Sequence, residues 1–407
     1  MVYQPPVGAR DLFPLDVAQK RWIEERLQRV FHGWGYHRII TSTLERLDTL
    51  MAGGAVEQST VIQVHDIEGV GLRPELTASI ARAAVTRMAS VNHPQRLYYN
   101  ANVFRRGDRG IQNRQQEFYQ AGVELLGSGG VSADAETLLV LSDCLKSLQL
   151  DSCYLVLGDA GLTRSLLSPF PEPLRTQIRE AIATLDRITL ETLPMDSSLR
   201  DRALLLMDLR GQPANVLQRV SSLDLDPEQR AIVSNLKALI ELLEGSGAAT
   251  PALILDLSLV QVFDYYTGIV FEVVSATDAG KFVLGQGGRY DQLLGLYHPQ
   301  GEVCPGIGFV LNIEDLHQVL LPTGKLPLQT AVSDRLVVPT EAQAYAAAFA
   351  HAQVLRESGD RLRVEVALQE ENAATIRDYA RQRQIAQIVW VSPSGETQSE
   401  SLGLVTK

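Results

Sequence analysis

Four blocks of the sequence carry polar side chains at spacings that can build a ligand pocket. In the first block, Glu75 and Thr77 lie two residues apart, so a carboxylate and a hydroxyl face the same side if the backbone is extended. Their oxygens suit an ammonium group, which offers three donors and needs acceptors around it. The alternative interpretation is a helix that begins at Pro74 and holds Glu75 in its first turn.

The second block runs from Phe104 to Gly127 and contains Gln120 and Glu124, four residues apart in an extended run. Both face the same side of that run, and buried Gln and Glu side chains require a polar ligand or partner. Arg105 begins the loop of this block, where a guanidinium can pair with a carboxylate or phosphate. The alternative is an outer strand with a solvated polar face.

The third and fourth blocks are weaker when taken singly. Tyr265 and Tyr266 are consecutive in a predicted strand, which places their phenols on opposite faces, so that one of them can meet a pocket. Two tyrosines in a strand are also common packing. The fourth block, residues 285–291, is rich in glycine, which permits close approach of the backbone, and residues 287–291 are predicted to open a helix.

The composition indicates a globular protein of two or three domains. The chain has 407 residues, of which 45% are hydrophobic and 21% charged, and it has no apolar run as long as a membrane helix. No signal peptide precedes the first helix, and the three cysteines are scattered, which fits a reducing compartment. The seven histidines show no metal-ligand spacing. We therefore expect a cytoplasmic protein without a metal or cofactor.

The charge argues against a nucleic-acid partner. The net charge is −11, and the residues from Ala331 onward hold eight Lys/Arg against ten Asp/Glu. A protein that grips phosphates usually presents a basic face. We therefore expect no tRNA binding by the C-terminal region.

Periodicity predicts the elements that position the four blocks. A helix is expected at Leu15–Trp34, a hairpin from Leu97–Phe104 and Gln116–Leu126, and mostly helix between residues 133 and 245. Strands return at residues 252–274, 281–284 and 305–311. The predicted domains are a body at 1–322 with a helical insertion at roughly 170–250, a linker at 323–333, and a small α/β domain at 334–407.

Taken in order, these blocks resemble histidyl-tRNA synthetases and their non-charging relatives over most of residues 5–320. The matching motifs are Gly8-Ala-Arg-Asp-Leu, Leu72-Arg-Pro-Glu-Leu-Thr, Glu117-Phe-Tyr-Gln-Ala-Gly-Val-Glu, Asp264-Tyr-Tyr-Thr-Gly-Ile-Val-Phe-Glu, Gly287-Gly-Arg-Tyr-Asp and Pro305-Gly-Ile-Gly-Phe. The resemblance implies an α+β class II synthetase-like fold, an antiparallel sheet flanked by helices, which forms dimers. The positions that hold histidine in the family correspond to Glu75, Thr77, Arg105, Gln120, Glu124, Tyr265 and Tyr266.

The departures from the family pattern fall on groups that handle ATP. Gln261 stands where the family has an arginine that contacts the α-phosphate, and Asp315 stands where an arginine stacks on adenine. Asn312 replaces a glycine, and Gly107 replaces a glutamate that reads adenine. Loss of one such donor typically slows a reaction about a hundred- to a thousand-fold. The resemblance therefore implies a chain that does not activate histidine.

The relatives that fit this pattern are regulatory subunits of ATP phosphoribosyltransferase. They imply a short-form catalytic subunit as partner, feedback regulation by L-histidine in the first step of histidine biosynthesis, and a C-terminal region that resembles a shortened anticodon-binding domain. Two alternatives remain open. One is a divergent histidyl-tRNA synthetase that activates histidine with ATP, and the other is a stand-alone paralogue that senses histidine or modifies another protein.

Overall fold

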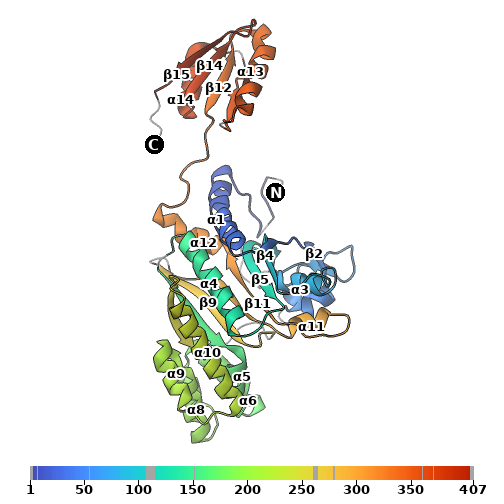
Figure 1. Cartoon of the computed structure of the whole chain (residues 1–407), viewed down its shortest axis with the longest axis vertical. Helices are drawn as coiled ribbons and strands as arrows, with labels where there is room; N and C mark the ends of the chain where they lie inside the picture. The colour runs from blue at the N-terminus through green and yellow to red at the C-terminus, as the bar shows by residue number, and fades with distance from the viewer. Residues whose placement is uncertain are drawn as a thin grey trace. The chain divides into compact units, whose positions relative to one another are not determined.

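The chain folds into two compact units (Figure 1). The computed structural model describes residues 3–6, 8–54, 56–106, 115–150, 152–259, 265–277, 280–359, 361–369 and 371–403. The units are Met1–Pro327 and Leu328–Lys407. Their boundary lies inside the segment 323–333 that the sequence predicts as a linker.

The larger unit is built on one sheet, which has nine strands in the described part of the chain. The spatial order is β1-β4-β5-β11-β10-β9-β6-β8-β7. The strands are β1 (His37–Arg38), β4 (Gln95–Phe104), β5 (Glu117–Leu126), β6 (Cys153–Asp159), β7 (Arg210–Gly211), β8 (Ala252–Asp256), β9 (Ile269–Thr277), β10 (Gly280–Arg289) and β11 (Gly306–Asn312). Neighbours run antiparallel except in the pairs β1–β4 and β6–β8. The predicted antiparallel sheet flanked by helices is thus confirmed.

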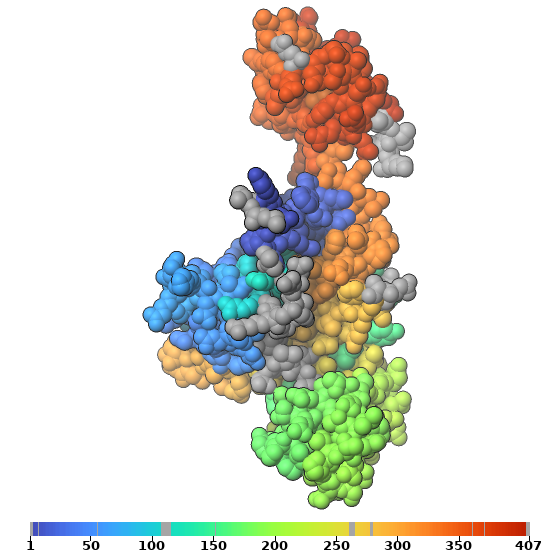
Figure 2. Space-filling view, turned by 180° about the vertical axis from the view of Figure 1, so that it is seen from behind, coloured from blue at the N-terminus to red at the C-terminus, as the bar shows by residue number. Residues whose placement is uncertain are grey.

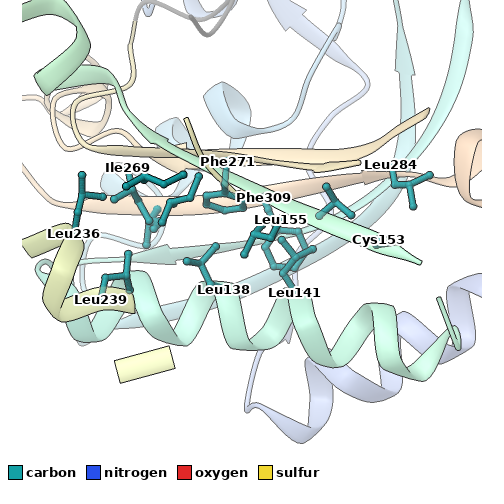
Figure 3. Close-up of a cluster of buried hydrophobic side chains, with 14 of the residues drawn as sticks. Leu138, Leu141, Cys153, Leu155, Leu236, Leu239, Ile269, Phe271, Leu284 and Phe309 are labelled. Atoms are coloured by element: carbon teal, nitrogen blue, oxygen red, sulfur yellow. The ribbon is translucent and has the colours of Figure 1, made fainter. Parts of the chain in front are cut away.

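One face of this sheet carries the main apolar core. Helices that contribute to this core include α1 (Pro14–Gly33), α4 (Val131–Ser147), α10 (Pro227–Gly245) and α12 (Ile313–Leu320), which the short η2 (Leu321–Thr323) follows. Leu138 of α4 and Leu239 of α10 lie in the same buried cluster as Phe271 and Phe309 of the sheet (Figure 3). The start of α10 follows from its sequence, because the Asp226 side chain accepts from the backbone N–H of Gln229 at 2.8 Å.

The opposite face of the sheet holds a second buried cluster. Side chains alternate along each strand, so Tyr98 and Val123 belong to the first cluster while Tyr99 and Leu126 belong to the second. The elements on or beside this face are α3 (Thr77–Val85), α11 (Leu293–Tyr297), α2 (Leu47–Met51), η1 (Gln58–Thr60) and the ribbon β2 (Leu44–Arg46) with β3 (Val70–Leu72).

A group of helices connects β6 to β8; they are the green to yellow-green ribbons of Figure 1 and the green to yellow-green region of Figure 2. Before α10 they are α5 (Ala160–Leu167), α6 (Glu172–Thr184), α7 (Arg187–Thr192), α8 (Ser197–Met207) and α9 (Pro213–Ser221). The expectation of mostly helix from 133 to 245 omits β6. Its short apolar run, residues 153–158, matches a strand buried in a sheet as well as it matches a helix.

The smaller unit is a four-stranded sheet, as far as the described residues go, with a helix on each face. Its elements are β12 (Arg335–Pro339), η3 (Ala342–Ala344), α13 (Tyr345–Glu357), β13 (Val364–Val366), α14 (Ala373–Gln382), β14 (Gln387–Val391) and β15 (Thr397–Ser401). The strands β13, β12 and β14 are parallel, and β15 adds antiparallel to β14. The last strand is an addition to the alternation that the sequence predicts.

Among the described residues, no helix has the length and apolar character that would let it span a membrane.

Candidate functional site

All seven side chains that the sequence singles out for a pocket line one cavity in the larger unit. They are Glu75, Thr77, Arg105, Gln120, Glu124, Tyr265 and Tyr266. They come from four separate stretches of the chain, which the sheet brings together. The pocket lies on the face of the sheet that carries the second cluster, opposite α4.

Strand β5 contributes the two most deeply buried polar groups. Gln120 and Glu124 are 4% and 2% exposed, and they point to the same side because both occupy even positions of one strand. The alternative interpretation of this block, an outer strand with a solvated polar face, is wrong, because β5 lies between β4 and β11.

The segment before α3 corrects the alternative interpretation of the first block, because the helix begins at Thr77 and not at Pro74. Glu75 stands just ahead of the helix, and its carboxylate accepts from the backbone N–H groups of Thr77 at 2.5 Å and Ala78 at 3.0 Å. A carboxylate at this place is favoured by the helix dipole. The same side chain lines the pocket, so the helix terminus fixes its position. Arg105 is held in turn by a bond from its Nε to the carbonyl oxygen of Pro74 at 2.9 Å.

The two tyrosines differ from the prediction. They precede β9 rather than lying in a strand, and both rings line the pocket, with centroids 4.8 Å apart. The chain turns here because the N–H of Thr267 bonds to the carbonyl oxygen of Arg289 at 2.7 Å. Without strand alternation, consecutive side chains are free to share a side.

Tyr290 is a pocket residue that the sequence argument passed over. Its hydroxyl donates to Oε2 of Glu124, while the Thr77 hydroxyl donates to Oε1 at 2.8 Å. The prediction that residues 287–291 open a helix is wrong, because β10 continues to Arg289 and α11 begins at Leu293. A tyrosine directly after a glycine-rich strand was the available signal, since glycines there allow neighbouring chains to approach closely. The other lining residues outside the predicted set are Leu76, Tyr99, Gln286, Gly308, Phe309 and Val310.

The pocket concentrates carboxyl groups in an apolar setting. Burial raises the pKa of Glu124 to about 8, against the opposing effect of the hydrogen bonds from Tyr290 and Thr77. Burial also raises the pKa of Glu75, although backbone N–H groups and Arg105 oppose the rise. Such carboxyls are prepared to receive a ligand that brings positive charge or N–H donors.

The positions that depart from the synthetase pattern are partly visible. Gly107 and Gln261 lie outside the described residues. Asn312 ends β11 beside the pocket and accepts a hydrogen bond from Nε2 of Gln120 at 3.1 Å. Asp315 lies in the first turn of α12, where burial raises the pKa of its carboxyl and Asn312 opposes that rise. One of the replaced positions, Asn312, is therefore bonded directly to a pocket residue.

Close strand packing behind the pocket depends on glycine. A Cβ atom on Gly308 would lie 2.1 Å from Oε2 of Glu124 and 2.4 Å from the carbonyl oxygen of Val123. We expect Gly308→Ala to lower the free energy of unfolding by about 1–3 kcal/mol, as overpacking does, measured by denaturant titration. Gly129→Ala is the matched control, because its Cβ would meet nothing closer than Pro305 at 3.5 Å. Equal stability of the two variants would contradict this packing argument.

The cavity encloses about 30 Å³, enough for one or two waters. Within the described residues, no group of three or more His, Cys, Asp or Glu side chains could hold a metal ion. The arrangement offers acceptors, phenols and one guanidinium. It can bind a small polar cation or zwitterion.

Comparison with known proteins identifies relatives of this chain. A family model described as histidyl-tRNA synthetase matches residues 8–316. A relative from Nostoc sp. PCC 7120 named "ATP phosphoribosyltransferase regulatory subunit" is 65% identical over 397 residues, covering 97% of this chain and 98% of the relative.

Solved structures share the fold. The crystal structure of an ATP phosphoribosyltransferase regulatory subunit/histidyl-tRNA synthetase from Bacillus halodurans is 25% identical with a TM-score of 0.80, covering 96% of this chain and 99% of the other. That of histidyl-tRNA synthetase from Nostoc sp. PCC 7120 is 20% identical with a TM-score of 0.78, covering 98% and 97%. The latter likeness shows the fold alone. Nostoc sp. PCC 7120 therefore has both the 65% identical relative and a separate histidyl-tRNA synthetase.

Proposed function

Because this chain belongs to the family of ATP phosphoribosyltransferase regulatory subunits, we propose that it is the non-catalytic regulatory subunit of such an enzyme. In this role a short-form catalytic subunit requires it for activity. It also senses L-histidine and so provides feedback regulation of the first step of histidine biosynthesis.

The observation that carries this proposal is the contrast between the two halves of the site. The seven side chains that correspond to histidine-binding positions line one pocket, while Asn312 and Asp315 occupy positions where synthetases have a glycine and an arginine. An aspartate repels a triphosphate, and a neutral side chain cannot supply the positive charge that adenylate formation needs. A pocket that keeps its amino-acid half without its nucleotide half suits sensing rather than activation.

The small cavity supports a link between ligand and conformation. A histidine molecule is larger than one or two waters, so it enters only if side chains that line the pocket move. A ligand that binds one arrangement better than another shifts the equilibrium between them. The coupling is reciprocal. The catalytic subunit should therefore change the affinity of this chain for histidine by the same factor by which histidine changes its affinity for the catalytic subunit.

The partners follow from the same proposal. The synthetase-like body self-associates as a dimer, and the dimers assemble with the catalytic subunit into a closed hetero-oligomer in the cytoplasm. The charge of the smaller unit, with eight Lys/Arg against ten Asp/Glu from Ala331 onward, argues against a role in tRNA binding.

The decisive experiment compares two activities of the purified full chain. We expect no histidine-dependent exchange of pyrophosphate into ATP. The histidyl-tRNA synthetase from Nostoc sp. PCC 7120 is the positive control. We expect a short-form phosphoribosyltransferase to become active when the chain is added, and histidine to inhibit only the mixture. Exchange at the rate of the positive control would instead establish a divergent synthetase. Failure of both assays would favour a stand-alone paralogue.

A further inference from the structure

Asn312 occupies a helix-capping position without capping the helix. It is the N-cap residue of α12, yet its side chain accepts from no N–H of that helix. An asparagine at this position normally satisfies a backbone donor and stabilises the helix. Here the register of β11 and β5 places it directly opposite Gln120, and its Oδ1 accepts from Nε2 of Gln120 at 3.1 Å.

The partners of Asn312 determine which way its amide faces. Its Nδ2 donates to the carbonyl oxygen of Val283 at 3.4 Å. A carbonyl oxygen only accepts, so it must meet the amide nitrogen. The amide oxygen of Asn312 is then left for Gln120, which must present its own nitrogen.

This chain of hydrogen bonds reaches the ligand pocket. The bond to Asn312 turns the nitrogen of the Gln120 amide toward β11, so the oxygen of this pocket-lining amide, Oε1, is the atom turned away from Asn312. Glu75 and Glu124 add carboxylate oxygens from α3 and β5. Among the lining residues in the part of the chain that the structure describes, the cation is Arg105.

We propose that Asn312 is a positioning residue that makes the pocket selective for ligands carrying an ammonium group, by holding the Gln120 amide with its oxygen toward the ligand. This inference rests on the proposed function, in which the pocket binds an amino acid. It gives Asn312 a role of its own instead of treating it as a lost synthetase glycine. A side chain that forgoes a local stabilising bond in order to orient a pocket residue is expected at functional sites.

The test measures selectivity rather than affinity, because a merely structural role would change the binding of all ligands together. Calorimetry on the full chain at pH 8 would compare L-histidine with imidazolepropionate, which keeps the ring and the carboxylate but lacks the amine. We expect the wild type to prefer histidine. In Asn312→Ala the Gln120 amide can turn over, so the preference should fall about tenfold or more, the factor that a hydrogen bond to a charged group supplies.

Asn312→Asp provides the matched control. In N312D a carboxylate oxygen at position 312 still accepts from Nε2 of Gln120, so the orientation of the Gln120 amide is kept and the preference for histidine should not fall. An unchanged preference in N312A, while the wild type still binds histidine, would overturn the positioning role alone. A fall of the preference in N312D to the N312A value would also overturn it. A wild type that binds no histidine at millimolar concentration would overturn both this inference and histidine sensing.

Discussion

Replacing Arg289 with methionine should lower the free energy of unfolding of the larger unit by about 3–5 kcal/mol, because it leaves a buried carboxylate without its partner. Arg289 Nε lies 2.9 Å from Oδ1 of Asp134, and the two side chains are only 7% and 11% exposed. A second bond joins Arg289 to Asp291 at 3.0 Å. The guanidinium thereby ties the first turn of α4 to the end of β10, next to the pocket residue Tyr290.

Denaturant titration in a Trp390→Phe background would measure this loss, since the remaining tryptophans, Trp22 and Trp34, both lie in the larger unit. Burial raises the pKa of Asp134 to about 6, and Arg289 opposes that rise. Without the arginine the pKa rises further, so the difference from wild type should shrink as the pH falls toward about 6 and level off below it, where Asp134 is protonated in both proteins.

Arg187→Met is the matched control for the buried pair. Arg187 and Asp208 form an exposed pair at 3.1 Å, with side chains 49% and 51% exposed, and such pairs contribute about 0–1 kcal/mol. If R289M were no less stable than R187M, the ion pair would not anchor α4 to the sheet.

The part of the site that the sequence could predict is the part that depends on local periodicity. Gln120 and Glu124 share a face because strand side chains alternate, and that rule needs no knowledge of the neighbouring chains. The hairpin of β4 and β5 and the long helix α1 follow from patterns that lie within single segments. The order of the motifs then placed all seven candidate residues in one pocket.

The remainder depends on contacts between distant segments. The bond from Tyr290 to Glu124 joins residues 166 positions apart, and that from Gln120 to Asn312 joins residues 192 apart. No periodicity within either segment encodes them. The side that Tyr265 and Tyr266 share depends likewise on a turn that is held by Arg289 of another strand. The strand β6 was missed because a short apolar run fits a buried helix equally well.

These distant bonds bear on how the proposed histidine pocket can signal. Thr77 and Tyr290 are both hydrogen-bonded to Glu124, so the carboxyl is already bonded from α3 and from the segment after β10. A ligand that displaces either hydroxyl from Glu124 releases one of those elements. Under the proposed function, such a displacement would link histidine binding to movement of α3 or of Tyr290, as allosteric coupling requires.

Glu124→Gln should weaken histidine binding about 10- to 100-fold, because an amide replaces the carboxylate that meets an N–H donor of the ligand. The expectation rests on the proposed histidine pocket. Since the pKa of Glu124 is raised to about 8, the carboxyl is mostly protonated at pH 7 in the free protein and must lose that proton when the ligand binds. The affinity of the wild type should therefore rise as the pH increases from about 6.5 to 8 and then level off.

Calorimetry at pH 7 in two buffers of different ionisation enthalpy would measure the proton directly. The wild type should release about one proton more per bound histidine than E124Q does, and the comparison removes any proton change on the ligand itself. Thermal melting checks that E124Q is folded. The raised pKa of Glu124 contributes stability at acid pH that is lost as the pH rises toward 8, so E124Q should gain stability relative to wild type over that range. Equal proton release by the two proteins would mean that the ligand meets Glu124 in its neutral form, and the proton-coupled rearrangement at this carboxyl would have to be abandoned.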